Sequence, residues 1–220
     1  MMVIKALRDD LSHPLSIFRI VYGLLMTGAL SRIWIHGWIE SLYIQPSFHF
    51  KYQYWTWIPH PSSLSIYALF ILSIISALGI SLGGLRKKWL FKSSVWTFFI
   101  SFTFIELIDK AYYLNHYYLI SLLAFIMAVA PSHYFLRPKN QSWPLWMIRL
   151  QITTLYFFSG IAKFQYDWLC TAQPLKIWLE NRAHYPMIGS LLSSDTIAFL
   201  FSWAGFIFDL IIGFLLIHPR

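Results

Sequence analysis

Two ionisable side chains, Lys163 and His116, lie at the ends of apolar stretches, where they could take part in acid/base chemistry. Lys163 closes the apolar stretch Trp143–Lys163, and His116 immediately precedes the apolar stretch Tyr117–Leu136. A lysine amine in a poorly solvated pocket loses hydration and can act as a general base near neutral pH. A nearby imidazole would complete an acid/base pair. The structural alternative is an amine that reaches the membrane surface and pairs with Asp167, with His116 as a helix cap.

The residues around Lys163 form a polar stripe. Its members are spaced by four, three, four, three and four positions, a pattern that places them on one face of a helix. Gly160 on this face allows a ligand or another backbone to approach beside the lysine, so Gly160 and Tyr156 are candidate pocket residues. The members of the stripe are Arg149, Thr153, Tyr156, Gly160, Lys163 and Asp167.

Other charges in apolar stretches are interpreted as structural. Glu106 and Lys110 have the spacing of an ion pair on one helix, with Asp109 beside them. Asp209 lies well inside the last apolar stretch and needs a partner, for which Arg19 and Arg149 are the candidates. We expect these six residues to be buried structural charges.

Several functional classes have no support in the sequence. The histidines lack the spacing of zinc ligands and there is a single cysteine, so we predict no metal site. Neither a Gly-x-Ser-x-Gly motif nor a glycine-rich phosphate loop is present, which disfavours hydrolytic and ATP-driven enzymes. The net charge of +8 comes from thinly spread lysines and arginines, so we predict no nucleic-acid partner.

The elements that carry these residues are typical of a membrane protein. Hydrophobic residues make up 58% of the 220 residues and charged residues only 12%, whereas soluble domains carry about a quarter charged residues. The apolar runs are continuous, which favours helices over barrel strands. We predict an all-α, polytopic transmembrane helical bundle in the lipid bilayer, a single domain over residues 1–220, with about six spans. These are Leu15–Trp34, Leu64–Leu85, Trp89–Ile108, Tyr117–Leu136, Trp143–Lys163 and Thr196–Ile217.

The basic residues predict the orientation. The cluster Arg86, Lys87, Lys88 and Lys92, with Lys5 and Arg8 before the first span and Arg220 after the last, favours a cytoplasmic N-terminus. His116 and Lys163 then lie on the same, non-cytoplasmic side. There, Gly37–Ser63 is rich in aromatic residues, including Trp55 and Trp57, and forms either an interfacial belt or a vestibule for an apolar substrate. The more polar Asp167–Asp195 is expected to form an extramembrane cap.

Four blocks of the sequence resemble, in order, the vitamin K-dependent gamma-glutamyl carboxylase family, whose membrane part is called the HTTM domain. They are Phe18-Arg19 with Gly23 and Leu25-Met26; Leu107-Ile108-Asp109-Lys110 with Asn115-His116; Gly160-Ile161-Ala162-Lys163 with Asp167-Trp168; and Asp209-Leu210 with Gly213-Phe214.

The resemblance implies a lyase that uses vitamin K hydroquinone or a related reduced quinone, with oxygen and carbon dioxide as co-substrates. Lys163 would deprotonate the hydroquinone, and oxygen would convert it to a strong, epoxide-forming base. That base would take a gamma proton from a glutamate in a protein or peptide, and the carbanion would add carbon dioxide. His116 would assist the carbanion step, and Asn115 belongs to the same block. The resemblance also implies a site on the non-cytoplasmic side, in the cell membrane if the protein is bacterial.

Two departures qualify this interpretation. Full carboxylases continue beyond the position of Arg220 with more membrane helices and a large lumenal domain. This chain is therefore expected to be a fragment, a split protein whose missing region a separate chain supplies, or a minimal membrane-only homologue. Ala162 stands where animal members have a second lysine. Two alternatives stay open: a non-enzymatic or inactive HTTM-type protein with an immunity or structural role, and a transporter subunit that uses the polar fifth stretch as a pathway.

Overall fold

The computed structural model describes residues 13–83, 87–136 and 143–217, and every regular element in these ranges is a helix. The predicted all-α class is therefore confirmed. Lys5, Arg8, Arg86 and Arg220, which the orientation argument uses, lie outside the described residues, as does Leu85. The chain divides into two compact units, Met1–Leu145 and Trp146–Arg220. One domain can contain two such units, so the single domain over residues 1–220 stays a prediction.

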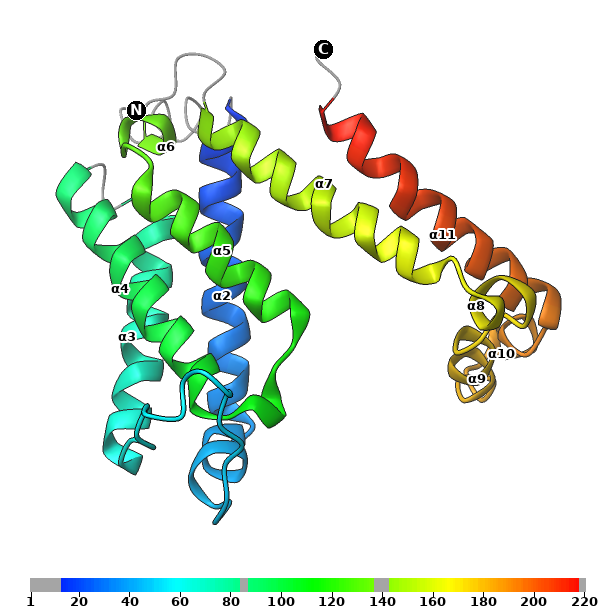
Figure 1. Cartoon of the computed structure of the whole chain (residues 1–220), viewed down its shortest axis with the longest axis horizontal. Helices are drawn as coiled ribbons and strands as arrows, with labels where there is room; N and C mark the ends of the chain where they lie inside the picture. The colour runs from blue at the N-terminus through cyan, green and yellow to red at the C-terminus, as the bar shows by residue number, and fades with distance from the viewer. Residues whose placement is uncertain (1–12, 84–86, 137–142, 218–220) are drawn as a thin grey trace. The chain divides into compact units, whose positions relative to one another are not determined.

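The first unit is built on four helices that pack side by side: α2 (Pro14–Ile35), α3 (Ser63–Ser81), α4 (Lys88–Ile108) and α5 (Asn115–Val129) (Figure 1). Helix α2 begins at Pro14, whose fixed φ suits the first helical position. The preceding His13 caps it by accepting a hydrogen bond from the Leu15 amide at 3.2 Å. Between α3 and α4, the Ser73 and Ser101 hydroxyls lie 2.7 Å apart, so the small polar groups in this apolar interface satisfy one another.

The fourth predicted span is interrupted. Ala130, which follows α5, has an extended backbone with ψ 143°, because the residue before a proline avoids the helical conformation. The chain returns to helix only in the short α6 (His133–Leu136), which packs against α2. Lys92 donates to the Ala130 carbonyl at 2.8 Å and so satisfies one of the free carbonyls at the end of α5.

The connections of this unit are mostly irregular. A π-helical turn, η1 (Glu40–Ile44), follows α2, and the aromatic segment that leads to α3 has no regular helix of its own. A single 3₁₀ turn, η3 (Lys110–Tyr112), joins α4 to α5. The Lys110 amide donates to the Phe50 carbonyl at 2.8 Å, which shows that the aromatic segment and the α4–α5 connection lie at the same end of the unit.

The second unit pairs α7 (Trp143–Lys163), from Trp146 onward, with a long α11 (Asp195–Ile217). Three short helices connect them: α8 (Tyr166–Cys170), α9 (Leu175–Glu180) and α10 (Gly189–Leu192). All three contact α11 (Figure 1). The segment expected to form a cap is therefore helical and packs on α11, while its place outside the membrane stays a prediction.

Four of the described helices are long and apolar enough to cross a membrane: α2, α3, α4 and α11. Helix α5 is apolar but has only 15 residues, and α7 is as long as α4 but more polar. The chain is thus an integral membrane protein with several apolar helical spans. The six spans and the cytoplasmic N-terminus stay predictions.

Candidate functional site

The second unit places Lys163 in a compact polar cluster. Its ammonium donates to the Asp209 carboxylate on α11 and to the Ser159 hydroxyl at 3.0 Å. Ser159 in turn donates to the same Asp209 oxygen at 2.6 Å. The Lys163 Nζ also lies 5.2 Å from the centre of the Trp168 ring, a cation–π distance. The side chain of Lys163 is 20% exposed and that of Asp209 is 9% exposed, so the ion pair is largely removed from solvent.

The local sequence explains this geometry. Ser159 precedes Lys163 by four residues and therefore lies on the same face of α7. A Cβ on Gly160 would lie 2.7 Å from the Leu210 side chain, so glycine permits the close approach of α11. Two turns further back, Thr153 donates to the Gly213 carbonyl at 3.1 Å.

The polar stripe of α7 thus faces α11. Tyr156 belongs to the same face, and its ring meets Phe208 edge to face at 5.9 Å. Gly160 admits another backbone, as the sequence predicted. Whether Gly160 and Tyr156 also contact a substrate stays a prediction.

The partners of the charged residues differ from the expected ones. Asp209 pairs with Lys163, whereas the sequence suggested Arg19 or Arg149. Arg149 is half-buried, with its guanidinium 5.4 Å from the centre of the Trp146 ring. Helix α7 ends at Lys163 and Asp167 belongs to α8, so these two residues do not form an i,i+4 pair on one helix. Lys163 and Asp167 do not share a helix face because α7 ends between them.

Arg19 is buried, as predicted, with 2% of its surface exposed. It donates to the carbonyls of Ser81 at 2.6 Å and Ile80 at 3.1 Å, at the C-terminal end of α3. It also donates to Phe135 of α6 at 3.3 Å. The guanidinium therefore stabilises the negative end of one helix and joins three helices of the first unit.

The first unit contains a cavity of about 250 Å³ between α2, α4 and the start of α5. Three predicted residues line it: Glu106, Asp109 and His116. His116 is exposed and makes an edge-to-face contact with Tyr117 at 4.6 Å. Asn115, Trp55 and Trp57 are not among the lining residues. The two tryptophans are exposed and the centres of their rings lie 5.8 Å apart. Whether their segment forms an interfacial belt or a vestibule stays a prediction.

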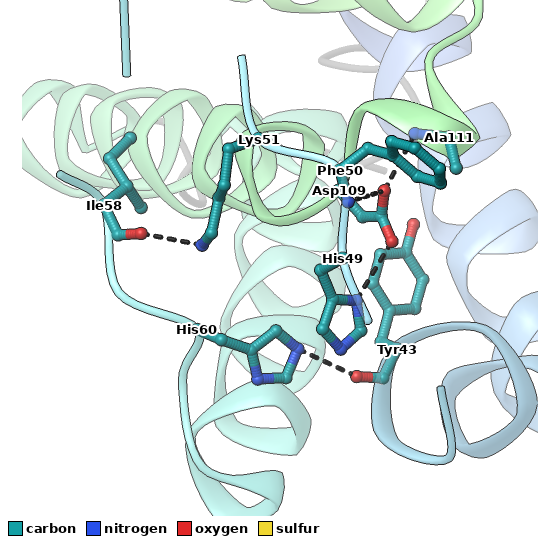
Figure 2. A network of polar contacts seen from close by, with 8 residues as sticks. All are labelled: Tyr43, His49, Phe50, Lys51, Ile58, His60, Asp109 and Ala111. Carbon is teal, nitrogen blue, oxygen red and sulfur yellow. Dashed lines mark hydrogen bonds and ion pairs between the residues drawn. The ribbon is translucent and has the colours of Figure 1, made fainter. Parts of the chain in front are cut away.

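Asp109 holds the aromatic segment against the end of α4 (Figure 2). One carboxylate oxygen accepts from the amides of Phe50 at 3.1 Å and Ala111 at 2.8 Å. The other oxygen lies 3.0 Å from the His49 Nδ1. Both oxygens therefore have partners within the protein, and Asp109 is a buried structural charge as predicted.

Sequence reasoning missed a pair of stacked imidazoles in this network. The His49 and His60 rings lie 3.9 Å apart, and the His60 Nε2 lies 3.1 Å from the Tyr43 carbonyl oxygen (Figure 2). Burial, and secondarily the positive charge on His49, lowers the pKa of His60. Within the same segment, the Lys51 ammonium donates to the Ile58 carbonyl at 2.7 Å. The residues are 11 positions apart in an irregular segment, so no periodic signal could have linked them.

Glu106 does not have the partner that its spacing suggested. Helix α4 ends at Ile108, and Asp109 has an extended backbone with φ −145°, so Lys110 leaves the helix face and is exposed. The expected burial of Lys110 is therefore wrong. Glu106 Oε2 accepts a hydrogen bond from Ser121 of α5 at 2.6 Å instead. Its other oxygen, Oε1, is buried and has no hydrogen-bond partner among the described residues.

His116 belongs to the first unit and Lys163 to the second, and each unit is described by itself. The shared pocket of these two residues therefore stays a prediction from the sequence. The structure establishes the surroundings of each: a cluster with a carboxylate and a hydroxyl for Lys163, and the lining of a cavity for His116.

The family model described as the HTTM domain matches residues 8–220, which is nearly the whole chain. No solved structure matches this chain.

Proposed function

Since the chain belongs to the HTTM domain family, we propose that it is a membrane enzyme that couples oxidation of a reduced quinone to carboxylation of peptide glutamate. The observation that carries this proposal is the position of Lys163. A lysine amine at the end of a long helix, one-fifth exposed and in contact with a carboxylate, is a candidate for proton transfer in a membrane protein.

The surroundings of the amine support a role in proton transfer. Lys163 can act as a base only after its ammonium has lost a proton. The Asp209 carboxylate is in direct contact with the ammonium and can receive that proton, which leaves a neutral amine and a neutral carboxylic acid. Ser159 donates to the same carboxylate oxygen and keeps it in place. In this proposal Asp209 positions the base and stores its proton.

The substrate would be vitamin K hydroquinone or a related reduced quinone. The Lys163 amine takes a proton from a hydroquinone hydroxyl. Oxygen then converts the deprotonated quinol to the strong base that takes the glutamate proton and forms the epoxide. The Trp168 ring beside the amine offers a flat apolar surface for an aromatic ring. We assign His116 to the glutamate carbanion step. The peptide would bind with help from a separate chain.

The test is an activity assay in membranes that contain the full chain. Vitamin K hydroquinone, a glutamate-containing peptide and radiolabelled bicarbonate are supplied, and both epoxide and labelled peptide are measured. We expect Lys163→Met to lower both products by about 100-fold or more, the usual contribution of a general base. His116→Ala should lower carboxylation more than epoxidation.

Lys176→Met is the matched control. Lys176 is a second lysine of the same unit, paired with Asp195 at 2.7 Å on the surface. Its removal should leave both products unchanged. Epoxide formation by Lys163→Met equal to that of the unsubstituted protein, or no epoxide from the unsubstituted protein, would contradict the proposed function.

One observation favours a second candidate function, a non-enzymatic HTTM membrane protein. Lys163 neutralises a buried carboxylate and is hydrogen-bonded to Ser159, which is a complete structural role for a lysine at a helix end. In that case the unsubstituted protein gives neither epoxide nor carboxylated peptide, and Lys163→Met affects stability alone.

A further inference from the structure

The first unit carries an apolar groove next to the cavity that contains Glu106. The groove has a volume of about 790 Å³ and runs along α2 to Ile120 and Leu123 of α5. Met26, Ala29 and Ile120 line both the groove and the cavity, so the two adjoin. Their linings differ in chemistry: the groove is almost wholly apolar, whereas charged and phenolic side chains line the cavity.

The groove suits an apolar chain. Ile17, Val21 and Leu25 line it and are 40%, 46% and 66% exposed. They belong to α2, one of the helices that are long and apolar enough to span a membrane. In a bilayer, such a surface contacts hydrocarbon, which is also where the tail of an amphiphile resides.

The cavity offers one hydrogen-bond acceptor without a partner. Glu106 Oε1 is buried, lines the cavity and accepts no hydrogen bond from the described residues. A buried carboxylate oxygen in this state is costly, and a ligand that donates to it removes that cost. Glu106 Oε2 is already bonded to Ser121, and Ser121 also receives a hydrogen bond from Thr103 at 3.2 Å. These two hydroxyls hold the carboxylate in position.

The charges around the cavity favour a neutral head group. The Arg32 guanidinium, 5.2 Å from the centre of the Trp38 ring, lines the cavity and disfavours a cationic head. Asp109 and Glu106 disfavour an anionic one. Among neutral donors, a hydroxyl is the type of group that Glu106 already binds at Oε2. The imidazole of His116 and the phenol of Tyr117 can add further hydrogen bonds.

We propose that the cavity and the groove form one binding site for a neutral amphiphile with a hydroxyl head, an alcohol or a phenol. The hydroxyl donates to Glu106 Oε1, and the apolar tail lies along α2. This site uses no residue of the Lys163 cluster, so it stands whether or not Lys163 is catalytic. It shares only His116 with the machinery of the proposed function.

The test compares two ligands that differ only in the proposed hydrogen bond. The full-length protein in nanodiscs is photolabelled with a long-chain 4-alkylphenol that carries a diazirine in its tail. 4-Dodecylphenol and its methyl ether then compete with the label. We expect the phenol to compete at least about tenfold better, as for the loss of one buried hydrogen bond. Labelled peptides should come from α2 and the first half of α5.

Two substitutions test the two halves of the site. Glu106→Leu removes the acceptor and should abolish the preference for the phenol over its ether. Ala29→Phe fills the junction of cavity and groove and should abolish the specific labelling. Ala68→Phe is the control, because Ala68 lines a separate apolar groove between α3 and α4. Glu40→Gln controls for the loss of a carboxylate elsewhere, since Glu40 binds the Tyr67 hydroxyl at 3.0 Å.

Three results would overturn the proposal: equal competition by phenol and ether, labelling that maps outside the groove, or full labelling of Ala29→Phe. The ligand comparison uses the unsubstituted protein, so the test remains decisive even where Glu106→Leu does not fold. The assay measures binding alone, and its failure therefore leaves the activity test of Lys163 untouched.

Discussion

Lys163 can be interpreted either as a structural partner of Asp209 or as a catalytic base. Its ammonium contacts a carboxylate that is 9% exposed, and a hydroxyl bridges the two groups. Removing one member of such a pair leaves the other charge without compensation in a poorly solvated place. Replacing both members by apolar groups removes the problem. The pair can therefore be tested for its structural role separately from its chemistry.

We predict that Lys163→Met lowers the free energy of unfolding by about 3 kcal/mol, because Asp209 then keeps only its hydrogen bond with Ser159. Asp209→Leu should cost a similar amount. The double variant should recover most of the loss. Equilibrium unfolding in bicelles measures all three. Additive losses in the double variant would show that the two side chains are not energetically coupled.

The His60 imidazole makes the aromatic segment sensitive to pH. Its pKa is lowered from 6.5 in the folded protein, so the folded segment binds fewer protons than the unfolded chain. The segment is therefore fully stable above about pH 6.5 and loses stability as the pH falls below that value. The charges on His49 and Lys51 act in the same direction.

We expect amide hydrogen exchange in residues 48–60 to be faster at pH 5.5 than at pH 7.5, after correction for the intrinsic rate. His60→Gln should show a smaller change because it has no proton to gain. Exchange that is equally slow at both pH values in the unsubstituted protein would argue against this role of His60.

At the scale of elements, helix contacts depend on small residues. A Cβ on Gly23 of α2 would lie 2.5 Å from the Ala77 carbonyl oxygen and 2.6 Å from the Ser81 amide nitrogen of α3. Both atoms are backbone and cannot move aside cheaply. Gly28 lies in the same helix and has nothing within 4 Å of the position of a Cβ. The two glycines therefore form a matched pair.

We predict opposite effects for the same substitution at these positions. Gly23→Ala should lower the free energy of unfolding by about 1–3 kcal/mol through overpacking of α2 against α3. Gly28→Ala should raise it by about 0.5–1 kcal/mol, since alanine is the better helix former. Thermal unfolding in one detergent compares the two. A stable Gly23→Ala protein would mean that α2 and α3 pack less closely than described.

At the scale of the whole molecule, the orientation decides which compartment the proposed site faces. Cysteine labelling can test the orientation, because Cys170 is the sole cysteine of the chain and is exposed. The basic residues predict that the end of α7, and with it Cys170 in α8, lies on the non-cytoplasmic side.

We expect a membrane-impermeant maleimide to label Cys170 in intact cells. In a Cys170→Ala background, Lys88→Cys at the start of α4 should be labelled only after the membrane is opened. The reverse pattern would place the N-terminus outside and move the proposed site to the cytoplasmic face.

The sequence by itself determined the helical class, the apolar helices and the close approach at Gly160. Composition and unbroken apolar runs carry this information locally. Helix ends were less accessible: the predicted span Tyr117–Leu136 crosses Pro131, whereas α5 ends at Val129.

Only the tertiary structure decided which charges meet. Lys163 and Asp209 are 46 positions apart, Asp109 and His49 are 60 apart, and both pairs depend on how separate elements pack. Spacing along one helix instead suggested Asp167 for Lys163 and Lys110 for Glu106. Both suggestions failed at a helix end, where the 3.6-residue repeat stops and the chain turns away.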